Sequence, residues 1–133
     1  LFVFSMKITD NKLYLGDIPV DTIMQEYGSP LYVYEESVLR SQFRKLSAGF
    51  PRGLLEIHYA MKANSNQSLL RILAEEGSSI DAVSEFEVRL ALESGFEANQ
   101  IIFTGNNNTL REIEFCVEQN VSVNLGSLAL LEK

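Results

Sequence analysis

The chain has 133 residues, of which 46% are hydrophobic and 22% charged, a balance typical of a globular protein. The formal net charge of −7 argues against nucleic acid or an anionic membrane surface as a partner, and no apolar run approaches the roughly 18 residues of a membrane span. The single cysteine, Cys116, excludes an internal disulfide and a cysteine-rich metal site, so we predict no metal.

The first part of the chain is predicted to contain short strands, turns and two helices. A helix from Asp21 is expected to be capped by that residue and ended by Gly28, and an amphipathic helix follows over 35–48, ended by Pro51. The expected strands are Leu13–Leu15, Ile18–Val20 and Leu31–Tyr34.

After Pro51, short apolar runs alternate with segments of helical period. Strands are expected at 54–61, 79–83, 101–104 and 121–125, and helices at 68–76, 85–94 and 109–119, with a fourth helix capped by Ser127. Thr109 and Glu112 have the spacing of a capping box. This alternation predicts an α/β fold with a parallel sheet built from right-handed βαβ units. Periodicity does not distinguish an open sheet from a barrel, but no glycine-rich phosphate loop follows any strand, which favours the first half of a (β/α)8 barrel.

Polar residues gather where these strands end, and Lys62 is the most informative of them. We expect a lysine that leaves an apolar strand to be partly desolvated, which favours the neutral amine that reacts with carbonyl groups. The alternative is a rim lysine that extends to water. Asp81, in the second strand, is alternatively a helix cap or turn residue, and Glu87 a solvated residue of a first helical turn.

The run His58–Asn64 resembles the Tyr-Ala-x-Lys-Ala-Asn signature of fold-type III pyridoxal-phosphate enzymes, specifically the diaminopimelate decarboxylases. The run Gly77–Glu87 is similar to the Gly-x-x-x-Asp-Val-Val-Ser-x-x-Glu run of the same family, and 90–96 and 101–105 resemble its next helix and strand. The resemblance extends from about Leu13 to the end of the chain.

This resemblance implies that Lys62 binds pyridoxal 5'-phosphate covalently and is the catalytic lysine, with Ala60, Asp81 and Glu87 as further cofactor-binding residues. The implied activity is decarboxylation of meso-diaminopimelate to L-lysine, the last step of lysine biosynthesis, by a cytoplasmic homodimer that takes a small amino acid as substrate. The family's phosphate-binding and substrate-reading residues are expected beyond Lys133. The chain is thus expected to be an N-terminal portion, inactive alone, in which 1–34 is a strand and turn segment belonging to a C-terminal β-domain and 35–133 an incomplete barrel domain of about four βα units.

The chain departs from the family pattern at two places. Glu85-Phe86 stands where the family commonly has two glycines, and 105–108 lacks a lysine that the family often has there. Two alternatives stay open: a related decarboxylase acting on ornithine, arginine or carboxynorspermidine, and a non-catalytic half-barrel that binds a partner or small ligand. His58 is interpreted as structural or as a core histidine.

Overall fold

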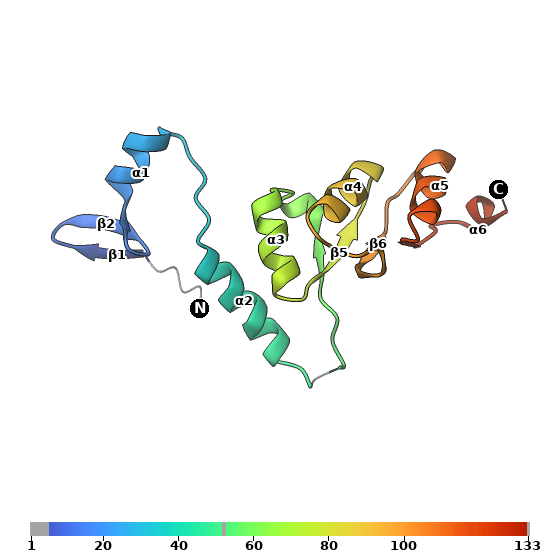
Figure 1. Cartoon of the computed structure of the whole chain (residues 1–133), viewed down its shortest axis with the longest axis horizontal. Helices are drawn as coiled ribbons and strands as arrows, with labels where there is room; N and C mark the ends of the chain where they lie inside the picture. Colours follow the sequence, from blue (N-terminus) through green and yellow to red (C-terminus); the bar gives the residue numbers. More distant parts are fainter. Residues whose placement is uncertain (1–5, 52, 133) are drawn as a thin grey trace. The chain divides into compact units, whose positions relative to one another are not determined.

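The computed structural model describes residues 6–51 and 53–132 and divides into two compact units, Leu1–Lys45 and Leu46–Lys133 (Figure 1). The division falls within one helix, α2 (Glu36–Ala48). That helix starts one residue after the start expected from its apolar spacing. No helix among residues 6–51 and 53–132 is long and apolar enough to cross a membrane.

The first unit contains a three-stranded antiparallel sheet, in the order β1-β2-β3, followed by one helix. Its strands and helix are β1 (Met6–Thr9), β2 (Lys12–Leu15), β3 (Ile18–Pro19) and α1 (Val20–Tyr27). Asp10 and Asn11 join β1 to β2 with φ angles of 51° and 58°. Two consecutive residues of positive φ are what a tight hairpin turn needs, and Asp and Asn tolerate this conformation better than most residues. The sequence pattern had not indicated β1.

Two expectations for this unit are wrong. The N-cap of α1 is Pro19, which makes no side-chain cap bond, and Asp21 lies in the first turn instead. Proline suits this position because its fixed φ is compatible with the start of a helix and it has no N–H to satisfy. Leu31–Tyr34 is not a strand, although its residues favour one. Gly28 does end α1, with a φ of 82° that a side chain would disfavour.

The second unit contains a four-stranded parallel sheet in the order β4-β5-β6-β7. The strands are β4 (His58–Ala60), β5 (Ser79–Ala82), β6 (Ile101–Phe103) and β7 (Ser122–Val123). The helices are α3 (Gln67–Glu75), α4 (Glu85–Glu93), α5 (Leu110–Glu118) and α6 (Leu128–Leu131), with 3₁₀ turns η1 (Met61–Ala63) and η2 (Ala98–Gln100).

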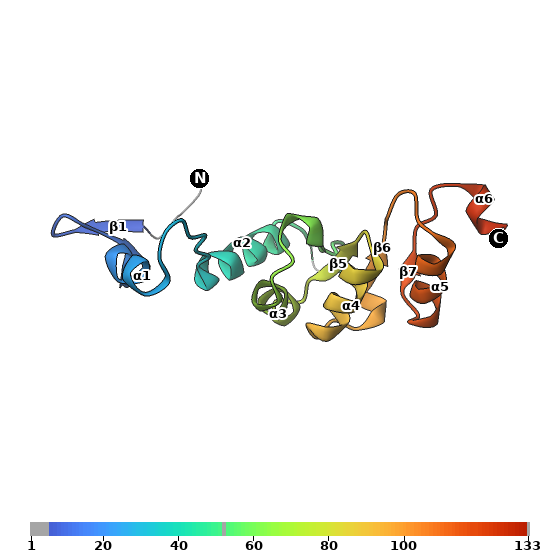
Figure 2. The same cartoon turned by 90° about the horizontal axis from the view of Figure 1, so that it is seen from above.

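Successive strands of this sheet are neighbours, and Figure 2 shows α3, α4 and α5 on the same side of it. An open doubly wound sheet has helices on both faces and a point where the strand order reverses. A sheet that adds parallel strands in sequence order and keeps its helices on one side is instead the beginning of a (β/α)8 barrel. The predicted α/β class and half-barrel are therefore confirmed.

The two faces of the sheet differ because side chains alternate along each strand. One face is apolar and almost fully buried, with Ile80, Ala82, Ile101 and Phe103 at most 1% exposed. The other face carries Ala60, Asp81 and Ile102, which lie opposite one another in the register. The helices supply further core side chains, which include Leu70, Leu73, Val88, Ala91 and Phe115.

Cys116 is fully buried in α5. Burial is the main cause that raises the pKa of its thiol to about 11, and the carboxylates of Glu112 and Glu85 raise it further. Desolvation disfavours a thiolate, so this side chain stays neutral and unreactive at neutral pH.

Candidate active site

The parallel strands bring four polar residues to one edge of the sheet. Lys62 follows β4, Asp81 lies near the end of β5, Thr104 follows β6, and Asn124 follows β7. Since all four strands run in the same direction, their carboxyl ends lie at the same edge. The sequence prediction of a polar rim at the carboxyl ends is therefore confirmed, and this is the edge at which barrel enzymes carry their active sites.

Lys62 lies on the 3₁₀ turn η1, directly after the buried Met61. The Tyr59 hydroxyl donates a hydrogen bond of 3.0 Å to the carbonyl oxygen of Asn64 and so joins the two ends of this turn. The Lys62 side chain itself is exposed. The partial desolvation that we expected for Lys62 is therefore not seen among the residues that the structure describes.

Asp81 is half-buried and points to the less apolar face of the sheet, opposite Ala60 in the register of β4 and β5. The Thr104 hydroxyl donates a hydrogen bond to Asp81 Oδ1. Asp81 is not a helix cap, since the N-cap of α4 is Ser84, whose Oγ accepts from the Glu87 N–H at 3.2 Å. Ala60, Asp81 and Lys62 thus lie at the carboxyl ends of two neighbouring strands, β4 and β5.

Glu87 is half-buried in the first turn of α4, and its Oε2 accepts a hydrogen bond of 2.7 Å from the backbone N–H of Val83. This bond fixes the corner between β5 and α4, directly after Asp81. The alternative of a freely solvated glutamate does not describe this contact. A role of Glu87 in cofactor binding stays a prediction.

His58 is the first residue of β4, at the end of the strand opposite to Lys62. The residue is exposed, so it is not a core histidine. Its Nε2 lies 3.4 Å from Glu56 Oε1, and its Nδ1 lies 3.3 Å from the Ile80 carbonyl oxygen. Ser79 donates to the same Glu56 oxygen at 2.7 Å. These contacts join the start of β4 to the start of β5, which supports the structural interpretation. Among the residues that the structure describes, no group of three or more His, Cys, Asp or Glu side chains is placed to hold a metal ion.

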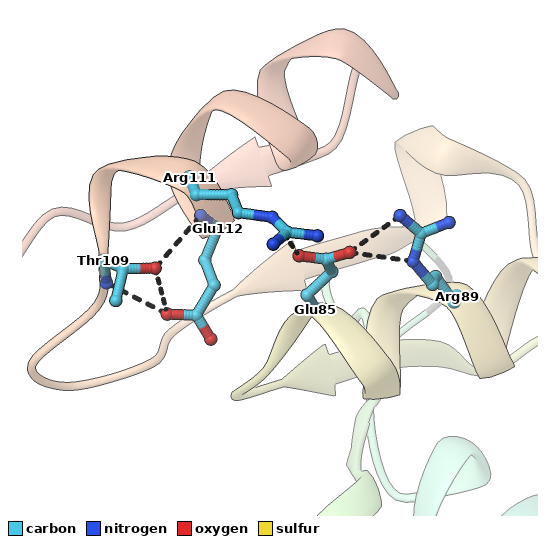
Figure 3. Close-up of polar contacts among 5 residues, drawn as sticks. All are labelled: Glu85, Arg89, Thr109, Arg111 and Glu112. Carbon is cyan, nitrogen blue, oxygen red and sulfur yellow. Dashed lines mark hydrogen bonds and ion pairs between the residues drawn. The ribbon is translucent and has the colours of Figure 1, made fainter.

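Glu85, which stands in place of a family glycine, connects α4 to α5 (Figure 3). Its Oε1 accepts from Arg89 Nε and Nη2 at 3.0 and 2.7 Å, and its Oε2 lies 4.0 Å from Arg111 Nε. The Arg89 guanidinium also lies 4.0 Å from the centre of the Phe115 ring. Glu85 therefore adds a contact between α4 and α5 that a glycine could not make. The Glu85 and Arg89 spacing of four residues is the signal that indicates the ion pair.

The predicted capping box of α5 is present and is also drawn in Figure 3. Thr109 Oγ1 accepts from the Glu112 N–H at 3.3 Å, and Glu112 Oε2 accepts from the Thr109 N–H at 2.9 Å and its hydroxyl at 2.8 Å. These hydrogen bonds, the backbone one first, hold the pKa of Glu112 below its ordinary value. The expected cap of the next helix is only partly confirmed, since Ser127 is at the N-cap of α6 but makes no side-chain cap bond.

The loop 105–108, which lacks the family lysine, lies beside the turn after β7. The Asn108 side-chain amide donates to the Gly105 carbonyl oxygen at 2.5 Å. A cavity of about 190 Å³ is lined by this loop together with Gly126, Ser127 and Leu130. Its walls include the three asparagine residues of the loop, so the surface here is polar although the loop has no lysine.

Comparison with known proteins identifies a family and several similar proteins. Residues 36–133 match the family described as "Pyridoxal-dependent decarboxylase, pyridoxal binding domain". The chain is 40% identical over 121 residues to the diaminopimelate decarboxylase of Methanothermobacter thermautotrophicus and 39% identical over 114 residues to that of Staphylococcus aureus. The alignments cover 90% and 84% of this chain but 28% and 27% of the relatives. The chain thus spans less than a third of the length of these proteins.

Solved structures agree with this result. The crystal structure of diaminopimelate decarboxylase from M. jannaschii matches with a TM-score of 0.90 and 28% identity, over 96% of this chain and 31% of that one. The lysine/ornithine decarboxylase of Vibrio vulnificus, solved with putrescine, matches with a TM-score of 0.78 and 26% identity, over 85% of this chain and 31% of that one.

Proposed function

Since the chain belongs to the pyridoxal-dependent decarboxylase family by its match over residues 36–133, we propose that it is the first part of an enzyme that decarboxylates meso-diaminopimelate to L-lysine. The observation that carries this proposal is the position of Lys62 in the 3₁₀ turn that follows β4, at the same sheet edge as Asp81. The names of the curated relatives support diaminopimelate as the substrate. The M. jannaschii enzyme has also been solved in complex with L-lysine, the product that we propose.

The residues present fit pyridoxal 5'-phosphate by the chemistry of their donor set. Lys62 offers an exposed primary amine, which is the group that binds an aldehyde. Asp81 offers a half-buried carboxylate, which suits a cationic partner, and Ala60 on the same face presents only a methyl group beside it. Glu87 keeps the corner after β5 in place through the Val83 N–H. We propose that Lys62 holds the cofactor and that Ala60, Asp81 and Glu87 complete this side of its site.

When bound, the cofactor supplies an electron sink, which accepts the electrons of the bond that joins the carboxylate to the rest of the substrate. The contribution of the chain is to bind and to move protons. Lys62 Nζ would hold the cofactor, and its primary amine would exchange a proton with the substrate. Asp81, held by Thr104 through a hydrogen bond, is placed to orient a positively charged group at the same edge.

We propose that residues 1–34 form part of a β-domain that later segments complete, and that 35–133 form the incomplete barrel domain. The antiparallel sheet of the first unit supports the separation of the two segments. The small amino-acid substrate, the homodimer and the cytoplasmic location implied by the family belong to the same proposal. The chain alone is expected to be inactive, because it spans less than a third of its relatives.

The proposal is tested by borohydride reduction of the full-length protein in the presence of pyridoxal 5'-phosphate, followed by peptide mapping. The expected result is one pyridoxyl group, at Lys62, which Lys62→Ala removes and the control Lys45→Ala, on the exposed face of α2, does not. Labelling elsewhere, or no labelling, would contradict the proposal and favour a non-catalytic binding module.

Substrate choice needs a second measurement, because the V. vulnificus structure favours a related alternative that acts on ornithine. We expect carbon dioxide release from meso-diaminopimelate with formation of L-lysine, at a kcat/KM well above those for ornithine, arginine and carboxynorspermidine. A higher kcat/KM for any of these three would assign the protein to the corresponding relative while leaving Lys62 as the cofactor lysine.

A further inference from the structure

Thr104 is the residue that joins β6 to the candidate cofactor site. It lies one residue after β6, and its hydroxyl donates a hydrogen bond to Oδ1 of Asp81 on the neighbouring strand. The sequence pattern had assigned no role to Thr104. We propose that Thr104 is a positioning residue, which holds the Asp81 carboxylate in the orientation needed for cofactor binding; this inference rests on the proposed function.

The register explains why these two side chains meet. Asp81 lies opposite Ile102 in the parallel pair of β5 and β6. Side chains two residues apart share a face of a strand, so Thr104 lies on the same face as Ile102 and Asp81. Thr104 is therefore two residues closer to the carboxyl end than Ile102, the residue directly opposite Asp81. At this offset along the strand direction its hydroxyl can reach the Asp81 carboxylate.

The backbone around Thr104 is fixed on both sides. Its N–H donates to the Ala82 carbonyl oxygen at 2.8 Å, which extends the β5–β6 ladder by one bond past the end of the strand. The next residue, Gly105, is buried so tightly that a Cβ there would lie 2.8 Å from the Val83 carbonyl oxygen. A β-branched side chain on such a backbone has few χ1 rotamers. The hydroxyl is thus preorganised toward Asp81.

Asp81 keeps the capacity for a second partner after this bond forms. A carboxylate has about four acceptor positions, and the Thr104 hydroxyl uses one of them. A charge-assisted hydrogen bond of this kind is stronger and more directional than a neutral one, so it limits rotation of the carboxylate. Removal of the Thr104 hydroxyl would keep the carboxylate of Asp81 but would no longer fix its orientation.

The test uses the full-length protein and titrates pyridoxal 5'-phosphate by its absorbance. Thr104→Val keeps the shape of the side chain and removes the donor, and we expect the dissociation constant for the cofactor to rise about tenfold, the usual effect of one hydrogen bond to a charged group. The absorbance spectrum of the bound cofactor is expected to change as well. Thr104→Ser is expected to restore most of the affinity and the parent spectrum, which a role in packing alone does not predict.

A double-mutant cycle separates action through Asp81 from direct action. In an Asp81→Ala background, Thr104→Val is expected to have no further effect on the dissociation constant, because the acceptor is already gone. A tenfold loss that persists in this background, or a Thr104→Val affinity within twofold of the parent, would overturn the inference while Lys62 labelling stands. A parent protein that takes up no cofactor, with no label at Lys62, would overturn the proposed function together with the inference.

Discussion

Gly105 occupies a place at which no side chain fits, and its substitution measures how rigid the edge of the sheet is. A Cβ at this position would lie 2.2 Å from Asn108 Oδ1, 2.8 Å from the Val83 carbonyl oxygen and 3.0 Å from Phe103 Cζ. The Asn108 side chain can rotate away, whereas the Val83 carbonyl belongs to the backbone that links β5 to α4 and Phe103 is fully buried. The constraint at Gly105 is therefore space, since its φ is not in the region that requires glycine.

Two losses determine the cost of Gly105→Ala. Rotation of Asn108 breaks its hydrogen bond of 2.5 Å to the Gly105 carbonyl oxygen, a loss of about 1 kcal/mol. The remaining overlap with Val83 and Phe103 is an overpacking strain of about 1–3 kcal/mol. We therefore expect the free energy of unfolding to fall by about 2–4 kcal/mol in total.

Urea unfolding followed by far-ultraviolet circular dichroism measures this change. Gly126→Ala is the matched control, because nothing lies within 4 Å of a Cβ there and its φ also suits an ordinary residue. We expect the control to change the stability by no more than about 0.5 kcal/mol. Adding Asn108→Ala to Gly105→Ala is expected to restore little of the lost free energy of unfolding, because the overlaps with Val83 and Phe103 remain. If Gly105→Ala were as mild as the control, the edge of the sheet would be free to move and the reasoning would be wrong.

Three further predictions concern caps, burial and the Lys62 turn. Thr109→Ala is expected to lower the free energy of unfolding by about 1 kcal/mol. The Thr109 N–H, which alanine keeps, and the Thr109 hydroxyl, which alanine lacks, both lower the pKa of Glu112. The part of the stability difference that comes from the hydroxyl should therefore shrink in urea titrations as the pH falls below the ordinary Glu value of 4.5 and through the lowered one. Iodoacetamide at pH 8 should label Cys116 only in urea, because burial raises the thiol pKa from 9.0 to about 11. Equal labelling rates by mass spectrometry in buffer and urea would contradict this. Because the folded state holds the thiol proton more tightly than the unfolded state, the contribution of this pKa shift to stability is present below the lower value and is lost as the pH rises toward the higher one. Tyr59→Phe should cost about 1 kcal/mol by removing the hydrogen bond to Asn64, and an unchanged urea midpoint would show that the bond contributes nothing to the turn.

Local signals in the sequence predicted the helices of the second unit well. The capping box from Thr109 to Glu112 depends only on residues three apart, so the sequence contains all the information needed to place it. Helix ends at Gly77 and Gly95 follow for the same reason, since a positive φ at a single residue is a local requirement.

Features that depend on a partner strand were not predictable in the same way. The apolar run 54–61 was expected to be a strand throughout, but β4 covers only His58–Ala60 because pairing begins where β5 begins, at Ser79. Leu54 is consequently 77% exposed. Thr104 and Asp81 are 23 residues apart in the sequence, and their contact depends on the register between β5 and β6. No local sequence pattern specifies that register.

The alternation of side chains along β5 has a consequence for which changes in the gene the protein tolerates. Ile80 and Ala82 belong to the helix-covered core, and Asp81 between them belongs to the site. Insertion or deletion of a single codon within β5 would exchange these roles, placing a carboxylate in the core and an apolar side chain at the site. The same change in the loop 105–108 would shift neither set. We therefore expect natural length variation among homologous genes to fall in the loops after the strands and to be absent from β5 itself.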